Sequence, residues 1–387
     1  MKDLDAELGQ RRAADLYRQR RTCYSQQGPE MEIDSRPVVT FCSNDYLGLA
    51  NHPAVNAAFH KGIDRWGTGS GAAHLISGHS AAHHALEEEL ADFTGRERAL
   101  LFSTGYMANL GVASALLGRA DAVFEDRFNH ASLLDAGLLA GARFQRYRHS
   151  DPADLAAKLA ASRTDGEKLV ATDGVFSMDG DIAPLSQLAG ICRRHAAWLM
   201  VDDAHGLGVI GDGGKGSLAA HDLTPAEAPI LMGTLGKAFG TFGAFVAGDR
   251  ALIETLIQQA RTYIYTTAPP PALAEATRVS LRIARREQWR RNYLQQLVRQ
   301  FKSFAVQLGL PLMESTTPIQ PLLIGDSARA VAMSEALLQR GILVSAIRPP
   351  TVPQNSARLR ITFSAAHSEK HLLQLTQALE EIFVKAA

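Results

Sequence analysis

The stretch "LMVDDAHGLGVIG", residues 199–211, joins an apolar run to two carboxylates and a histidine. The apolar run ends at Val201 and is typical of a buried strand, and Asp202, Asp203 and His205 follow it at once. Ligands of an open parallel sheet bind beyond the carboxyl ends of its strands, so we expect Asp202 and His205 to belong to a ligand site. Taken alone, this spacing also fits a carboxylate that caps a turn and a hydrogen-bonded loop histidine.

The same stretch contains "GLGVIG", which has the glycine spacing of a dinucleotide-binding turn. Such a turn needs a helix that starts within the motif, whereas "DGGKGS" follows here without helical periodicity. A phosphate loop is excluded as well, because neither Lys215 nor Lys237 is followed by Ser or Thr. The glycines therefore do not indicate a nucleotide site.

Short apolar runs alternate with helical patterns from about residue 80 to residue 260, which predicts an α/β fold with a mostly parallel sheet flanked by helices. We expect a helix and an extended segment in residues 1–50 and a large α/β domain in 51–270. A connecting helix, from about 271 to 308, and a smaller α+β domain are expected in 271–387. This last part has candidate strands near "QPLLIG", "ILVSAI" and "ARLRITF".

Composition favours a small-molecule partner in the cytoplasm. The 40 basic and 40 acidic residues cancel and form no long block of one sign, which argues against nucleic acid and membrane surfaces. The three cysteines are far apart and in no CxxC pair, which argues against disulfides and a metal site. No apolar run reaches the roughly 18 residues of a membrane span, and the charged N-terminus does not resemble a targeting segment.

Lys237 follows a second apolar run, 35 residues after Asp202, inside the glycine-rich loop of "LMGTLGKAFGTFGAF". A lysine and an aspartate at two strand ends are what pyridoxal phosphate requires, because the lysine forms a Schiff base and the carboxylate keeps the pyridine nitrogen protonated. Gly105 and Tyr106 open a helix whose N-terminus suits a phosphate. The residues that add hydroxyl donors are Ser177, Thr234, Thr266 and Thr267.

Seven segments, in order, resemble the α-oxoamine synthases over nearly the whole chain: "FCSNDYLGLANHP", "SGHSAAHHALEEELADFTG", "DRFNHASLLDA", "DGVFSMDGDIAPL", "MVDDAHGLGVIG", "GTLGKAFG" and "AIRPPTVPQNSARLRITFSAAH". The resemblance implies the aminotransferase-like fold type I of pyridoxal-phosphate enzymes, with a seven-stranded sheet, in a homodimer whose sites lie at the subunit interface. It also implies a decarboxylative condensation of an amino acid with an acyl thioester.

Within that family, "IRPPTVP" followed by "RLR" favours the member of biotin biosynthesis, which uses L-alanine and a pimeloyl thioester of coenzyme A or acyl carrier protein. Glycine C-acetyltransferase and 5-aminolevulinate synthase are the alternatives within the family. A non-catalytic binding protein on this fold is the alternative outside it, and the presence of Lys237, Asp202 and His205 argues against that alternative.

The resemblance implies a role for each catalytic residue. Lys237 would form the Schiff base, Asp202 would pair with the pyridinium nitrogen, and His205 would donate to the phenolic oxygen of the cofactor. His130 would stack on the ring and face the substrate. Other cofactor contacts would come from Gly105, Tyr106, Ser177 and Thr234, and, toward the neighbouring subunit's cofactor, from Thr266 and Thr267.

The implied substrate contacts are Arg360 for the amino-acid carboxylate, Arg18 for the far carboxylate of the pimeloyl chain, and Asn44 and Thr351. Alternation in "ARLRITF" places Arg358 and Arg360 on one face and cannot choose between them, and a solvent-facing strand edge explains both equally well. Arg18 has Arg20 and Arg21 beside it, and a solvated basic helix end is the simpler reading of that pattern. The family commonly has Glu where this chain has Asp173, so we expect an effect on rate and none on the chemistry.

Overall fold

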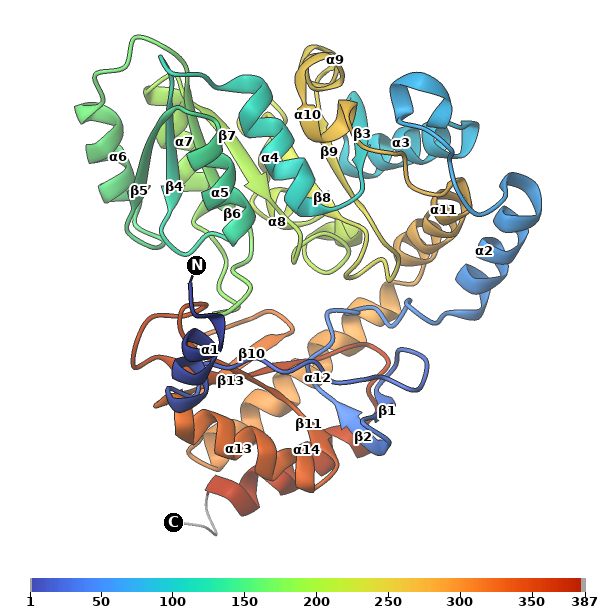
Figure 1. The fold of residues 1–387 in the computed structure, drawn as a ribbon, viewed down its shortest axis with the longest axis vertical. Coiled ribbons are helices and arrows are strands. Elements are labelled where there is room, and N and C mark those ends of the chain that lie inside the picture. The colour runs from blue at the N-terminus through green and yellow to red at the C-terminus, as the bar shows by residue number, and fades with distance from the viewer. Residues whose placement is uncertain (1, 384–387) are drawn as a thin grey trace. The chain divides into compact units, whose positions relative to one another are not determined.

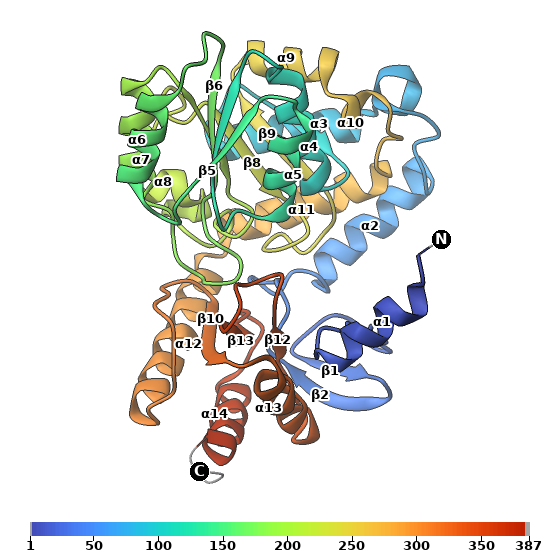
Figure 2. The ribbon, with the colours of Figure 1, turned by 60° about the vertical axis from the view of Figure 1, so that its left-hand side comes forward.

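The computed structural model describes residues 2–383 and divides into two compact units (Figures 1 and 2). Unit 1 contains residues 1–51, 177–181 and 289–387, and unit 2 contains residues 52–176 and 182–288. Between residues 2 and 383, no helix combines the length and the apolar character needed to cross a membrane.

Unit 2 is built on a seven-stranded sheet, in the order β3-β9-β8-β7-β6-β4-β5. β9 pairs antiparallel with both of its neighbours, β3 and β8, and every other pair in the sheet is parallel. The predicted mostly parallel sheet is therefore confirmed. In the register, Asp173 at the end of β6 pairs with Asp202 at the end of β7. The strands are β3 (Arg98–Phe102), β4 (Ala122–Asp126), β5 (Arg143–Tyr147), β6 (Lys168–Asp173), β7 (Trp198–Asp202), β8 (Ile230–Thr234) and β9 (Ala244–Gly248).

Helices flank this sheet (Figure 1), and side-chain caps begin several of them. Thr104 caps α4, Asp151 caps α6 and Asp249 caps α9, each by accepting a backbone N–H of the first turn. The helices of unit 2 are α2 (Pro53–Trp66), the π-helix η1 (His74–Gly78), α3 (Ala81–Thr94), α4 (Gly105–Leu116), α5 (Ala131–Leu139), α6 (Pro152–Ala161), α7 (Leu185–Arg194), the 3-10 turn η2 (Asp212–Gly214), α8 (Ser217–Ala220), α9 (Arg250–Gln259), α10 (Arg261–Ile264) and α11 (Pro271–Arg286).

One hydrophobic cluster of unit 2 joins the sheet to the helices α4, α9 and α10. Val112, Met200, Val246, Leu256 and Tyr263 are all within it and at most 5% exposed. This packing holds the strand ends, and the polar residues that follow them, in fixed positions.

Unit 1 has two three-stranded sheets, ordered β1-β2-β11 and β10-β13-β12. Phe363 anchors its core, with ring centroids 5.2 Å from Phe301 and 5.7 Å from Phe41. The elements are α1 (Leu4–Ala13), β1 (Glu30–Ile33), β2 (Arg36–Thr40), α12 (Gln288–Gln307), β10 (Ile319–Gly325), α13 (Ser327–Gln339), β11 (Ile342–Leu343), β12 (Ser345–Ile347), β13 (Ala357–Thr362) and α14 (Glu369–Phe383).

Two sequence expectations are wrong, and one alternative is excluded. The single helix expected from about 271 to 308 is two, α11 and α12, because Glu287 leaves the helical conformation (φ −95°, ψ 67°) where the chain passes from one unit to the other. The strand expected in "ILVSAI" is also two, since β11 pairs with β2 and β12 with β13. The solvent-facing edge considered for "ARLRITF" is excluded, because β13 is the central strand of its sheet and is buried along its length.

Candidate active site

Asp202 is the last residue of β7, and its side chain is buried at the end of that strand, with only 3% of the residue exposed. One carboxylate oxygen, Oδ2, accepts a hydrogen bond of 2.8 Å from Nδ2 of Asn109, and Oδ1 accepts from the backbone N–H of Ala204 at 3.1 Å. A buried carboxylate needs such donors to stay charged. The carboxylate of Asp202 is therefore held in one orientation at a buried position.

A chain of hydrogen bonds links Asp202 to His130, the N-cap of α5. The Asn109 amide also donates to Oγ of Ser132 at 2.8 Å, and that hydroxyl lies 2.7 Å from Nδ1 of His130. The sequence analysis missed Asn109 and Ser132. The available signal was an Asn among the mainly apolar residues of α4, where a buried amide must find partners.

Lys237 and His205 are brought into direct contact. Nζ of Lys237 lies 2.9 Å from Nε2 of His205, across loops that follow β8 and β7. The loop that carries Lys237 is closed by hydrogen bonds from Leu235 N–H and the Thr234 hydroxyl to the Gly243 carbonyl. Gly243 has φ +115°, a conformation that favours glycine, so the glycines of "GKAFGTFG" let this loop turn back on itself.

The electrostatics of His130 connect these groups. Partial desolvation lowers the pKa of His130 although its ring keeps contact with solvent, while the Asp202 charge raises that pKa and the Lys237 charge lowers it. Opposing effects of an anion and a cation on one ring require both to be near it. The ends of β7 and β8 and the start of α5 thus face a shared space.

Asp173, the residue that departs from the family pattern, also acts on His130. Its Oδ2 accepts a hydrogen bond of 2.7 Å from the backbone N–H of His130, and 4% of the residue is exposed. Burial, reinforced by the charge of Asp202, raises the pKa of Asp173 well above its ordinary value. Asp173 fixes the start of α5 and thereby the position of the His130 ring.

Asp203, the second carboxylate of residues 199–211, has a structural role. It is fully buried, and its Oδ2 accepts from the backbone N–H of Ser217 at 2.7 Å. Burial raises its pKa to about 7. A Cβ placed on Gly206 or Gly216 would overlap the Asp203 carboxylate, so glycine is required at both positions.

The N-terminus of α4 offers backbone donors at the end of β3. Thr104 caps the helix by accepting from Met107 N–H at 3.2 Å, and Gly105 and Tyr106 begin the first turn. The first N–H groups of a helix have no partner within it and attract anions. The Tyr106 hydroxyl donates to Asp135. This turn is suited to a phosphate group.

Thr266 and Thr267 follow α10, where Thr267 pairs with Ala73. Ser177 lies in the short segment, residues 177–181, that belongs to unit 1.

In unit 1, Arg360 lies among neutral oxygens. Its Nε donates to the Ser177 carbonyl at 2.6 Å, and Nη2 donates to Oδ1 of Asn44 at 3.2 Å. Arg358, on the same strand, is already paired with Asp179 at 2.7 Å. Of the two arginines that alternation could not separate, Arg360 is thus the one with a charge available for a substrate carboxylate.

Arg18 and Thr351, 333 positions apart, are brought together by a hydrogen bond of 3.2 Å. The neighbouring Arg21 is engaged by Asp34 and, at 2.6 Å, by Glu335. Within residues 2–383, Arg18 pairs with no carboxylate. This arrangement favours Arg18 over Arg21 as the partner of a substrate anion.

The residues of unit 2 fit pyridoxal phosphate. Asp202 supplies a buried, oriented carboxylate for a cationic ring nitrogen, Lys237 supplies an amine, and His130 supplies an accessible aromatic ring. The first turn of α4 supplies phosphate donors. Each part of the cofactor has a matching group.

Comparisons with known proteins agree with this donor set. The family model "Aminotransferase class I and II" matches residues 36–379. The curated 8-amino-7-oxononanoate synthase of Thioalkalivibrio sulfidiphilus (strain HL-EbGR7) is 64% identical over 380 residues, which cover 98% of this chain and 97% of that protein. The chain belongs to the 8-amino-7-oxononanoate synthase family.

Solved structures extend the likeness to three dimensions. The 8-amino-7-oxononanoate synthase of Francisella tularensis has a TM-score of 0.78 and 33% identity, covering 90% of this chain and 98% of that one. Serine palmitoyltransferase from S. paucimobilis, solved with pyridoxal phosphate bound to myriocin, has a TM-score of 0.93 and 29% identity, covering 98% and 96%. The resemblance inferred from the motifs and the predicted fold type I are confirmed for this member of the 8-amino-7-oxononanoate synthase family.

Proposed function

We propose that this chain condenses L-alanine with a pimeloyl thioester, releasing 8-amino-7-oxononanoate, CO2 and the free thiol, in biotin biosynthesis. The observation that carries the proposal is the contact of 2.9 Å between Lys237 and His205, with the buried Asp202 at the adjacent strand end. Curated relatives with the name 8-amino-7-oxononanoate synthase are 60% to 64% identical to the chain. The enzyme is an acyltransferase.

Pyridoxal phosphate is the cofactor. When bound, it withdraws electrons from the amino-acid Cα, which acidifies the Cα–H bond and allows the later loss of CO2. Lys237 would hold the cofactor through Nζ, Asp202 would pair with the ring nitrogen, and His205 would donate to the phenolic oxygen. His130 would stack on the ring, and the first turn of α4 would bind the phosphate. We also assign cofactor contacts to Thr234 and Ser177. We assign Thr266 and Thr267 to the cofactor of a second subunit.

The amine of Lys237 would be released when the amino group of alanine replaces it on the cofactor, and the released amine would then remove the proton from Cα of alanine. His205, 2.9 Å from that amine, keeps Nζ oriented. Asn109 and Ser132 keep Asp202 and His130 in place through their hydrogen bonds.

We assign the substrate anions to Arg360 and Arg18, neither of which pairs with a carboxylate among residues 2–383. Arg360, supported by Asn44, binds the carboxylate of alanine through its guanidinium. Arg18, with Thr351 beside it, binds the terminal carboxylate of the pimeloyl chain. Asp173 acts by positioning His130, so its shorter side chain affects the rate and leaves the chemistry intact.

The working enzyme is a cytoplasmic homodimer in this proposal. The acyl donor is a thioester of coenzyme A or of acyl carrier protein, and a steady-state assay of alanine with chain-matched thioesters of both carriers identifies which is used. Replacing alanine by glycine in the same assay separates this activity from those of glycine-using relatives.

The decisive variant is Lys237→Ala. We expect it to lose turnover and the visible absorption band of the lysine-bound cofactor, because this amine forms the covalent link. Lys215→Ala is the matched control, since Lys215 is an exposed lysine in a glycine-rich loop. A Lys237→Ala protein that keeps the band, or keeps turnover, contradicts the assignment.

A further inference from the structure

Four histidines and two glutamates lie between residues 74 and 88, outside the residues assigned to the cofactor and substrates. Two overlapping groups of their side chains bring possible metal-ligand atoms within 4.8 Å of one another: His74, His79 and His83, and His79, His84 and Glu87. All of them belong to unit 2.

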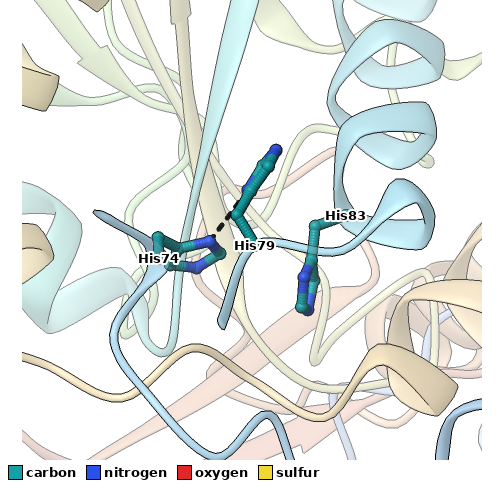
Figure 3. Close-up of side chains that lie close together, drawn as sticks. All are labelled: His74, His79 and His83. Atoms are coloured by element: carbon teal, nitrogen blue, oxygen red, sulfur yellow. Dashed lines mark hydrogen bonds between the residues drawn. The ribbon is translucent and has the colours of Figure 1, made fainter. Parts of the chain in front are cut away.

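Figure 3 shows the three histidines of the first group, of which His83 is already engaged. Nδ1 of His83 accepts the backbone N–H of Ser80 at 3.1 Å, and its Nε2 lies 2.8 Å from the Pro269 carbonyl, to which it donates. Both ring nitrogens are therefore used, one of them in the cap of α3. A metal ion could recruit His83 only by breaking that cap.

The second group, His79, His84 and Glu87, has the ligand types and the spacing that a metal ion requires. Nε2 of His79 is 3.9 Å from Oε2 of Glu87. Ligand atoms around a tetrahedral Zn²⁺ are about 3.3 to 3.5 Å apart, given bonds of about 2.0 to 2.2 Å, so a small rotation closes the gap. His84 and Glu87 are three residues apart on α3 and share a face.

His84 can become the third metal ligand with little loss of stabilising free energy. Its side chain is 65% exposed, and its present partner is Glu88 at 3.4 Å. An exposed pair of this kind contributes at most about 1 kcal/mol. The ring can therefore turn toward Glu87 without disturbing the core.

The other two ligands are already oriented by a second layer of hydrogen bonds. Nδ1 of His79 is 3.0 Å from Nδ1 of His74, a contact drawn as the dashed line in Figure 3. Oε1 of Glu87 accepts the backbone N–H of Leu101 at 3.0 Å. Metal-binding histidines and carboxylates in proteins characteristically have such partners on the atom that does not face the ion.

We propose that His79, His84 and Glu87 form a binding site for a divalent transition-metal ion of the zinc type, with water as the fourth ligand. His74 orients the His79 ring, and Leu101 orients the Glu87 carboxylate. The borderline-soft character of Zn²⁺ suits two imidazoles and one carboxylate.

Isothermal titration calorimetry of the holoenzyme with Zn²⁺ tests the site. A Cys23→Ser background removes the exposed thiol, which could bind zinc on its own. We expect one Zn²⁺ per chain, with affinity lowered at least tenfold in His84→Ala, His79→Ala and Glu87→Gln. His60→Ala, which removes an exposed histidine from another helix, is the matched control and should bind as the parent does.

His84→Ala is the most informative variant because an exposed side chain can be removed without unfolding, which circular dichroism verifies. Zinc binding that is unchanged in His84→Ala overturns the proposal, as does a parent enzyme that binds no zinc. Binding lost in His79→Ala alone would assign the ion to the His74–His79 pair and would equally refute this set of ligands.

Discussion

Asn109→Ala tests whether the buried amide of α4 holds Asp202 for the cofactor. Asn109 is fully buried and donates to a charged carboxylate and to a hydroxyl, each at 2.8 Å. Losing a hydrogen bond to a charged group costs about 1.5 to 3 kcal/mol, and losing a neutral one about 0.5 to 1.5 kcal/mol. The Ser132 hydroxyl keeps its contact with Nδ1 of His130 in the variant. Most of the lost free energy therefore comes from the hydrogen bond to the Asp202 carboxylate. We expect the free energy of unfolding to fall by about 2 to 4 kcal/mol.

Urea titration of the cofactor-free protein, followed by circular dichroism, measures that loss. A second readout distinguishes positioning from stability: the Kd for pyridoxal phosphate, from visible absorbance, should rise at least tenfold because Asp202 loses its orienting donor. Ser114→Ala, on the exposed side of the same helix, is the control and should change neither quantity. A variant that loses stability but binds the cofactor as tightly as the parent would refute the positioning role, and unchanged stability would refute the hydrogen-bond network.

Two further predictions concern the acyl chain and the thiols. Arg18→Ala should lower kcat/KM with the pimeloyl thioester by roughly tenfold, about 1.5 kcal/mol, which is the lower end for a charged hydrogen bond because Arg18 is exposed. A donor of the same length without the terminal carboxylate should show almost no loss, and equal losses with both donors would remove the assignment. Burial raises the pKa of the Cys192 thiol to about 12, so iodoacetamide at pH 8 should alkylate the exposed Cys23 in the native protein and reach Cys192 only after unfolding. Comparable labelling rates by mass spectrometry would contradict this.

Local patterns predicted the strands of unit 2 and the polar residues that follow them. Asp202 and Lys237 were found because each comes after an apolar run, and the order of such runs predicts where their ends meet. The pairing of Lys237 with His205 was not predicted, since it depends on two loops that approach each other in space.

Local sequence patterns could not predict tertiary contacts between residues that are distant in the sequence. Alternation treats Arg358 and Arg360 alike, and only Asp179, almost 180 positions away, separates them by neutralising the first. The split of "ILVSAI" depends on which sheet each half joins, which no local signal encodes. Asn109 was overlooked because a single polar residue does not alter the helical period of α4.

The buried carboxylate of Asp203 changes how the glycines around it are understood. In a dinucleotide-binding turn, glycines leave room for the phosphates of a ligand. Here Gly206, the first glycine of "GLGVIG", leaves room for a carboxyl group of the protein itself, and so does Gly216 beyond the motif. A smaller residue in place of Asp203 would remove the contact that excludes a side chain at Gly206, whereas Gly216, with φ +93°, would still favour glycine.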